Sequence, residues 1–282
     1  MIPASFDYVR AGTIEEAIGA LQEHGDDAKL LAGGHSLLPL MKLRLAAPEV
    51  VVDLGRIGDL RGVSDDDDSL VIGALTTHHE VVHDRMVRER CGVVADVSAM
   101  VGDAQVRHRG TIGGSLAHGD AAADLPTVMV ALDATLVAQG PSGRREIAAA
   151  DFFVDYLTTA LGHDEVLVEV RVPKLDPTWS WRYEKFSRVA QAWAIVGALG
   201  MVRRNNGSIE EARVGLTNMA TVPVRATAVE QALSGASPDK IGDAAQQAAD
   251  GTSPTGDLNA SPEFRQHLAR VLVGRALEAA AG

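Results

Sequence analysis

The chain has 282 residues, 46% of them apolar, and a formal net charge of −12. This composition suits a soluble globular protein with one large domain or two to three small ones. The acidic balance argues against a nucleic acid or an anionic membrane as the main partner.

Cys91 is the only cysteine. An intrachain disulfide is therefore excluded, and so is an iron–sulfur cluster built by this chain, which would need about four thiolates. A reducing, intracellular setting is expected. The first residues lack the pattern of a signal peptide, and no apolar run reaches the roughly 18–20 residues that a membrane-spanning helix needs.

Residues 1–54 are predicted to form a first α/β lobe. Phe6–Val9 is extended, and Thr13 with Glu16 has the pattern of a capping box for a helix that Gly25 ends. Lys29–Ala32 is predicted as a strand. The glycine turn Gly33-Gly34-His35-Ser36 follows, then a helix from Leu37 and a strand over Val50–Leu54.

Residues 55–177 are predicted to form a second lobe. Two strands flank the run Asp65–Asp68, which lacks the spacing of a calcium loop and is interpreted as a solvated turn. Thr77 begins a helix that carries His79 and His83 at i and i+4. Together with Glu80 these two residues have the order HExxH, which could hold a metal, but no third ligand is evident nearby, and solvent-facing histidines are favoured.

A second glycine pair, Gly113-Gly114, lies further along this lobe and leads into helices over Ser115–Ala117 and Asp124–Leu132. Before this glycine pair, a helix is expected at Val93–Met100. After it, strands are expected at Thr135–Ala138, Arg144–Ile147 and Glu165–Val172, and a short helix at Asp151–Phe153. Residues 173–177 are a linker candidate.

Residues 178–282 are predicted to form a separate α+β domain. Its strands are expected at Trp179–Ser187, Ala194–Arg203 and Ile209–Leu216, with a hairpin turn at Asn205-Asn206-Gly207. This gives a three-stranded antiparallel sheet. Helices are expected at Ala226–Leu233, Ser237–Ala249 and Ser261–Ala280, the last capped by Ser261.

The chain contains no GxGxxG, GxxxxGK[ST] or GxSxG motif, so common dinucleotide, ATP and serine-nucleophile patterns are absent from its sequence. A single glycine pair is most often only a tight turn. Here, however, the two pairs share a context: a short segment before, a hydroxyl side chain nearby and an apolar helix after. A glycine turn of this kind can leave several consecutive backbone N–H groups free, which together form an anion-binding nest. Two such nests facing each other would suit a pyrophosphate.

The stretches AGGHSLLPLMKLRL (32–45) and TIGGSLAHGDAAADLP (111–126) closely resemble the two FAD-binding segments of the flavoprotein (medium) subunits of molybdenum hydroxylases. MIPASFDYVR, VVDLGRIGDL, VIGALTTH, RYEKFSRVAQAWA and VGLTNMATVPVRA extend the resemblance over the whole length. Within that family the chain most resembles the aerobic carbon monoxide dehydrogenase type.

The resemblance implies a two-lobe FAD-binding domain of the vanillyl-alcohol-oxidase/p-cresol-methylhydroxylase type, with FAD between the lobes, and a flavoprotein C-terminal domain. It places Asp124 on ribityl or ribose hydroxyls, Leu167 and Lys185 near the flavin ring, Val101 beside the adenine and Trp193 close to the isoalloxazine. It places ten residues on the pyrophosphate: Ala32, Gly33, Gly34, His35, Ser36, Thr111, Ile112, Gly113, Gly114 and Ser115.

Four of these residues also have plain structural alternatives. Asp124 could cap a helix, Leu167 could be strand core, Lys185 could be a solvated lysine, and Trp193 could be core of the C-terminal sheet. The sequence also departs from the family pattern. Ser115 stands where Asn is usual, and Ala121 replaces the Pro of a GDP motif, which leaves the path of that loop and any role of Asp120 open.

The resemblance implies an oxidoreductase subunit without catalytic or metal-binding residues of its own. The molybdenum cofactor would lie on a large subunit and [2Fe-2S] clusters on a small one, in a dimer of heterotrimers. Electrons would pass through FAD to an external acceptor such as quinone. A cytoplasmic location is expected, with peripheral association with the inner face of the membrane as an option.

Three alternatives stay open. The complex could act on xanthine, an aldehyde or an N-heterocycle rather than carbon monoxide. The chain could be an assembly module that has lost FAD. It could also be a free-standing flavin oxidase, for which His35 would be a candidate covalent attachment site.

Overall fold

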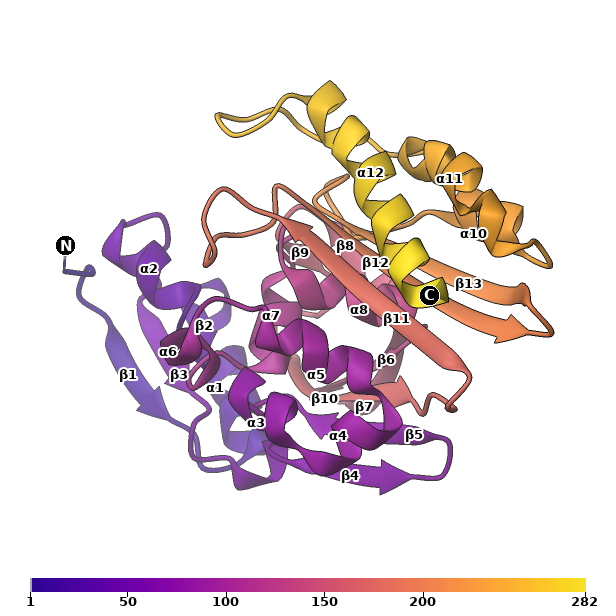
Figure 1. Cartoon of the computed structure of the whole chain (residues 1–282). Coiled ribbons are helices and arrows are strands. Elements are labelled where there is room, and N and C mark those ends of the chain that lie inside the picture. Colours follow the sequence, from indigo (N-terminus) through magenta and orange to yellow (C-terminus); the bar gives the residue numbers. More distant parts are fainter. Residues whose placement is uncertain (1) are drawn as a thin grey trace.

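The computed structural model describes residues 2–282, which are built around three main sheets (Figure 1). One sheet lies in each of the three predicted parts of the chain. A two-stranded ribbon of β8 (Phe153–Asp155) and β9 (Thr158–Thr159) accompanies the middle sheet.

The first sheet is parallel, in the order β1-β3-β2. Its strands are short: β1 (Asp7–Arg10), β2 (Ala28–Leu31) and β3 (Val50–Asp53). The connecting helical elements are α1 (Ile14–His24), the 3-10 turn Gly25–Asp27 and α2 (Leu37–Lys42).

Local signals set the bounds of α1 as predicted. Thr13 Oγ1 accepts a hydrogen bond from the Glu16 N–H at 3.1 Å, and Gly25 ends the helix with φ +52°. The Glu16 carboxylate accepts a hydrogen bond from the N–H of Gly12 at 2.7 Å and not from that of Thr13, so the capping box is only half formed. The apolar face of α1 packs toward Val166 and Val168 of the second sheet.

The second sheet is antiparallel, in the order β4-β5-β10-β6-β7. The strands are β4 (Val63–Asp66), β5 (Ser69–Gly73), β6 (Thr135–Gly140), β7 (Gly143–Ala148) and β10 (Val166–Pro173). All four aspartates of 65–68 are exposed at the β4–β5 hairpin, which confirms the solvated turn.

Helices cover this sheet and fill the space beside it. They are the 3-10 helix Gly58–Leu60, α3 (His78–His83), α4 (Arg85–Arg90), α5 (Gly92–Ala99), α6 (Ala104–Arg107), α7 (Ile112–His118), α8 (Asp124–Ala131) and α9 (Ala149–Phe152). The short helix expected over 151–153 ends at Phe152, because Phe153 already pairs with Thr159 in the ribbon.

The third sheet has four strands, so the prediction of a three-stranded sheet was wrong. Its order is β11 (Trp179–Phe186), β12 (Val196–Asn205), β13 (Ser208–Thr217) and β14 (Val224–Arg225). The fourth strand is two residues long, too short to show a two-residue periodicity. It is held at the edge by the ion pair of Arg225 with Glu230.

The helices of the third part follow its sheet. They are α10 (Thr227–Leu233), the 3-10 turn Pro238–Lys240, α11 (Ile241–Ala244), the 3-10 turn Ala245–Ala249 and α12 (Pro262–Ala281). The helix expected over 237–249 is thus broken into three pieces. The Ser261 cap of α12 is confirmed, since its hydroxyl accepts from the Phe264 N–H.

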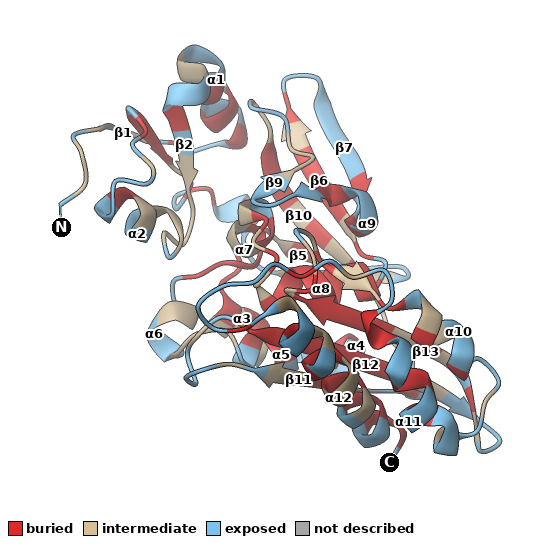
Figure 2. Cartoon of the chain, turned by 90° about the horizontal axis from the view of Figure 1, so that it is seen from above, coloured by how far each residue is buried: buried red, intermediate tan, exposed pale blue. Residues whose placement is uncertain are grey.

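Helix α8 joins the second and third parts. Every residue of α8 is buried, as expected for a helix that is apolar on all sides. Trp179, Tyr183, Leu199 and Met201 of the third sheet belong to the same core as the second lobe. Figure 2 shows this buried centre around α8 and β12, with the more exposed α1 and α2 set apart from it.

Candidate functional site

The two glycine stretches lie against each other, as predicted. A Cβ placed on Gly33 would be 2.2 Å from the Arg109 carbonyl oxygen and 2.7 Å from the Gly110 Cα. A Cβ on Gly114 would be 3.6 Å from that of Ala32. The fold therefore brings together two loops that are far apart in the sequence.

The first stretch presents unbonded backbone donors. Within residues 2–282, the N–H groups of Gly33, Gly34, His35 and Ser36 have no hydrogen-bond acceptor. Gly34 has φ +78°, which a side chain would disfavour. Ser36 precedes α2 without a capping bond from its hydroxyl. A run of free N–H groups is the arrangement that binds a phosphate.

The second stretch differs from the N–H nest that the sequence suggested. The Ile112 N–H donates to Thr76 O at 3.0 Å and the Gly113 N–H to Ala74 O at 2.9 Å. The N–H groups of Gly114 and Ser115 donate to the hydroxyl and carbonyl oxygens of Thr111, at 3.1 and 3.0 Å. Thr111 caps α7, so the glycine pair lies inside the first turn of this helix rather than before it. The hydroxyls of Thr111 and Ser115 remain able to donate.

Gly33 and Gly113 are required for close packing and not for a positive φ, which neither residue has. A Cβ on Gly113 would lie 2.4 Å from that of Ala74 and 2.6 Å from its carbonyl oxygen. Real Cβ atoms do not approach so closely, and the interior of a protein does not yield readily. Ile112 is fully buried beside them.

Asp124 and Lys185 form a buried ion pair. Lys185 Nζ lies 2.7 Å from Asp124 Oδ2, and the two side chains are 7% and 5% exposed. The cap of α8 is Ala123, so Asp124 is not the helix cap and Lys185 is not a solvated lysine. Burial raises the pKa of Asp124, while the Lys185 ammonium and the Tyr183 hydroxyl act in the opposite direction.

A cavity of about 270 Å³ adjoins Lys185. It is lined by residues from the end of α5 and the segment after it, and from the end of β11 and the segment after it: Ala99, Met100, Gly102, Lys185, Ser187 and Ala190. Val101 lies between two of these residues, and its carbonyl accepts from Arg107 Nη1 at 3.1 Å. The cavity thus brings the predicted Val101 segment and Lys185 to one place.

Leu167 and Trp193 have opposite environments. Leu167 is 5% exposed and belongs to the core of the second lobe, opposite Ala138 in the sheet. Trp193 is 63% exposed on the connection between β11 and β12, so the alternative that it is core of the C-terminal sheet was wrong. His35 is also exposed.

The altered loop at 119–121 has a defined path without the proline. Gly119 ends α7 with φ +66°. The Asp120 carboxylate accepts from the Ala122 N–H at 2.8 Å. Ala121 is buried, and its carbonyl accepts from the N–H of Asn218 at 2.8 Å. The loop therefore contacts the C-terminal domain through its backbone, which an alanine can provide as well as a proline.

Two groups near the site were missed from the sequence. Tyr183 OH donates to Asp124 Oδ1 at 2.8 Å. Since Tyr183 and Lys185 are two apart on one strand, their shared face was a usable signal. His78 is buried, its ring Nδ1 has no hydrogen-bond partner, and its backbone N–H donates to Gly110 O at 2.9 Å. Burial, Arg107 and His35 lower the pKa of His78 to about 4.

The histidines of the HExxH stretch, His79 and His83, stack with His108. His79 lies between His83 and His108, with ring centroids 4.2 and 3.8 Å apart. Among residues 2–282 no group of three or more His, Cys, Asp or Glu side chains is arranged to hold a metal ion.

Comparisons with known proteins decide the family. The family model for the FAD-binding domain in molybdopterin dehydrogenase matches residues 4–175, and that for the CO dehydrogenase flavoprotein C-terminal domain matches residues 181–280. The chain is a member of the FAD-binding medium subunits of molybdenum hydroxylases. It is therefore an FAD-dependent oxidoreductase subunit of the carbon monoxide dehydrogenase-like group.

Individual relatives agree over the full length. The carbon monoxide dehydrogenase medium chain of Hydrogenophaga pseudoflava is 39% identical, covering 99% of this chain and 98% of the relative. The 6-hydroxypseudooxynicotine dehydrogenase complex subunit alpha of Paenarthrobacter nicotinovorans is 36% identical, covering 98% of this chain and 95% of the relative. A solved structure of carbon monoxide dehydrogenase from H. pseudoflava matches with a TM-score of 0.97 and 40% identity, covering 99% of this chain and 98% of that one.

The residues of this medium subunit fit FAD. The unbonded N–H groups of the first glycine stretch suit a pyrophosphate, and the Asp124 carboxylate has lone pairs left for hydroxyl donors. In the part of the chain that the structure describes, no helix is long and apolar enough to cross a membrane.

Proposed function

We propose that this medium subunit transfers electrons within a molybdenum hydroxylase of the carbon monoxide dehydrogenase type. It would take them from the iron–sulfur clusters of a small subunit, after oxidation of the substrate at the molybdenum cofactor of a large subunit, and deliver them to an external acceptor such as quinone. The full-length similarity to carbon monoxide dehydrogenase medium chains carries this proposal.

The FAD site proposed here has two unequal halves. The N–H groups of Gly33, Gly34, His35 and Ser36 would hold the pyrophosphate, aided by the hydroxyls of Thr111 and Ser115. The backbone at Ala32, Ile112, Gly113 and Gly114 would set the distance between the halves. Bound FAD supplies the redox chemistry, because a flavin accepts and releases one or two electrons.

The remaining site residues come from both domains. Asp124 would accept from the ribityl or ribose hydroxyls, and Lys185 would place a positive charge near the edge of the flavin ring. Val101 would lie beside the adenine, and Leu167 and Trp193 near the ring. The exposure of Trp193 leaves it free to cover a ring, since an aromatic face packs well on another planar group.

The assembly and its location are also proposed. The one cysteine, Cys91, is fully buried, and burial raises the pKa of its thiol to about 12. A thiol in that state is a poor cluster ligand, which supports partner chains as the source of the iron–sulfur clusters. We propose a dimer of heterotrimers in the cytoplasm, in peripheral contact with the inner face of the membrane when a membrane quinone is the acceptor.

The test is anaerobic reduction of the intact complex. The three chains are co-purified, and flavin absorbance is followed after addition of carbon monoxide, xanthine, an aldehyde or an N-heterocycle. Carbon monoxide should bleach the flavin. If no substrate bleaches a flavin that dithionite does reduce, the electron-transfer role is wrong.

A second candidate is a medium subunit of an N-heterocycle dehydrogenase. The chain is 36% identical to the 6-hydroxypseudooxynicotine dehydrogenase subunit, close to its 39% and 38% identity to the carbon monoxide dehydrogenase medium chains. This similarity supports the second candidate. Bleaching by an N-heterocycle and not by carbon monoxide would select it. The sequence of the large subunit around its active site would give the same answer.

A free-standing oxidase with flavin attached to His35 predicts a different result. Acid denaturation would leave flavin on the protein if the bond were covalent. We expect complete release, because the role proposed for the first stretch uses its backbone N–H groups and not the imidazole.

A further inference from the structure

Helix α8 is fastened to the C-terminal sheet along its whole length. At its start, Asp124 bonds to Tyr183 and Lys185 of β11. In its middle, the Thr127 hydroxyl lies 2.7 Å from that of Thr217 and 3.2 Å from Leu216 O.

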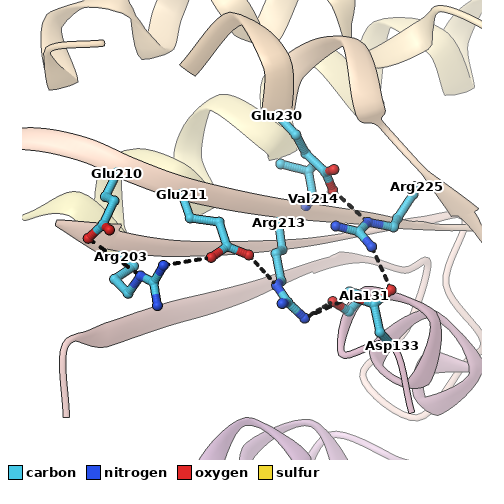
Figure 3. Close-up of polar contacts among 9 residues, drawn as sticks. All are labelled: Ala131, Asp133, Arg203, Glu210, Glu211, Arg213, Val214, Arg225 and Glu230. Carbon is cyan, nitrogen blue, oxygen red and sulfur yellow. Dashed lines mark hydrogen bonds and ion pairs between the residues drawn. The ribbon is translucent and has the colours of Figure 1, made fainter. Parts of the chain in front are cut away.

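The far end of α8 is held by Arg213 and Arg225 (Figure 3). Arg213 donates to Ala131 O at 3.3 Å and pairs with Asp133 at 3.1 Å, and Arg225 pairs with Asp133 at 2.7 Å. Glu211 and Glu230 in turn hold these two arginines. The C-terminal domain therefore helps to set the position of α8, and with it that of Asp124.

The hydroxyl groups at the start of α8 form a chain with one direction. Tyr183 has a single hydroxyl proton and donates it to Asp124. The bond of 2.9 Å between Tyr183 and Thr217 must then have Thr217 as donor, and Thr217 in turn accepts from the Thr127 hydroxyl. Burial and the nearby Asp124 raise the pKa of Tyr183 well above its ordinary value, so the phenol keeps its proton. Thr217 thereby makes Tyr183 a better donor to the carboxylate.

Two strand glycines make room for this chain. A Cβ on Gly197 of β12 would lie 2.3 Å from the Tyr183 hydroxyl oxygen and 2.9 Å from Thr217 Cβ. A Cβ on Gly215 of β13 would lie 2.7 Å from Thr127 Cγ2. Neither glycine has a positive φ, so space explains their presence in the sheet.

We propose that Tyr183, backed by Thr217, is a positioning residue that fixes the Asp124 carboxylate for binding FAD. One carboxylate oxygen is held by Tyr183 and the other by Lys185, both from β11. This fixes the plane of the carboxylate and directs its remaining lone pairs. The inference rests on the proposed FAD site and adds that the C-terminal domain, rather than the FAD-binding lobes alone, determines its geometry.

The main test measures the dissociation constant of FAD for the full-length chain, first freed of flavin. Tyr183→Phe removes the donor and should raise this constant about tenfold or more. The matched control is Tyr8→Phe, which also removes a tyrosine hydroxyl that donates to an aspartate, Asp53, but at an exposed edge of the first sheet. It should leave the constant unchanged.

Two variants of Thr217 distinguish a positioning role of its hydroxyl from a packing role of its side chain. Thr217→Val keeps the shape and loses the hydroxyl, whereas Thr217→Ser keeps the hydroxyl and loses a methyl group. Positioning predicts weaker FAD binding for the valine variant, by about threefold to tenfold, and near-normal binding for the serine variant. A packing role predicts the reverse order, with the serine variant the weaker, and would overturn the proposal even if Tyr183→Phe does not fold.

The midpoint potential of bound FAD gives a third measurement that packing alone would not move. Without the Tyr183 donor, Asp124 offsets more of the Lys185 charge, so the potential should shift to more negative values in Tyr183→Phe. If wild type binds FAD and both the affinity and the potential of Tyr183→Phe equal those of wild type, only the positioning role is wrong. If wild type does not bind FAD, the proposed function falls with it.

Discussion

The two glycine stretches share a sequence pattern but use it for different purposes. In Gly33–Ser36 the N–H groups are unbonded within the described chain and available to a ligand. In Ile112–Ser115 the same groups are bonded to Ala74, Thr76 and Thr111, and the glycines allow close packing. A glycine pair therefore indicates a close backbone approach, and only the hydrogen bonds around it show whether the approaching group is a ligand or the protein.

The largest effect on stability is expected at the second stretch. Gly113→Ala places a Cβ 2.4 Å from that of Ala74 and should lower the free energy of unfolding by about 3 kcal/mol. Urea unfolding of the full-length chain measures this change. Gly19→Ala is the control, because its Cβ in helix α1 meets nothing within 4 Å and should be neutral to slightly stabilising. Equal stability of the two variants would contradict the packing role.

The contact between the stretches should be sensitive to pH through His78. Its pKa is lowered to about 4, so the unfolded chain binds this proton more readily than the folded chain does. Stability contributed by neutral His78 is complete above about pH 6.5 and should fall by about 3 kcal/mol as the pH decreases to about 4. Unfolding free energies across this window should have a smaller slope in His78→Gln.

His163→Gln is the control for that experiment, because the His163 side chain is 67% exposed. It should keep the slope of wild type. If His78→Gln also keeps that slope, the buried neutral imidazole does not have the role given to it here.

Gly34 tests the first stretch. Gly34→Ala should lower the free energy of unfolding by about 1 kcal/mol, because its φ of +78° disfavours a side chain. It should also weaken FAD binding about tenfold, since any shift redirects the free N–H groups. Gly207→Ala also places a side chain at a positive φ, of +84°, but in the β12–β13 hairpin, where its Cβ would meet nothing within 4 Å. FAD affinity should be unchanged in Gly207→Ala; similar affinities in both variants would count against the first stretch as the phosphate site.

Ser115 should give the smallest change in stability. Its hydroxyl has no hydrogen-bond partner within residues 2–282, so Ser115→Ala should change the free energy of unfolding by less than about 0.5 kcal/mol. FAD affinity should fall about threefold to tenfold through the loss of one hydrogen bond. Ser115→Asn should keep the affinity of wild type. An unchanged affinity in Ser115→Ala would remove this hydroxyl from the site.

Local signals made much of the fold predictable. Thr13, Gly25 and Ser261 mark helix ends with interactions that span only a few residues, and the structure confirms each of them. Strand β14 was missed because its two residues carry no periodic pattern, and it exists through pairing with Gly215 and Leu216. Elements that depend on a distant partner leave little trace in their own sequence.

The same distinction between local and distant interactions explains which parts of the site could be predicted from the sequence. The first glycine stretch could be predicted because its turn is local. The Asp124–Lys185 pair joins residues 61 apart, and no spacing rule connects them. Whether the N–H groups of Gly113 and Gly114 are free depends on Ala74 and on the way Thr111 caps α7, which the sequence does not show.

Amide hydrogen exchange, with and without FAD, tests the asymmetry of the two stretches most directly. We predict that the amides of Gly33, Gly34, His35 and Ser36 exchange rapidly without FAD and become protected when it binds. Those of Ile112 and Gly113 should be protected in both states. Rapid exchange at Ile112 and Gly113 that only FAD suppresses, or no protection of 33–36 by FAD, would contradict the account.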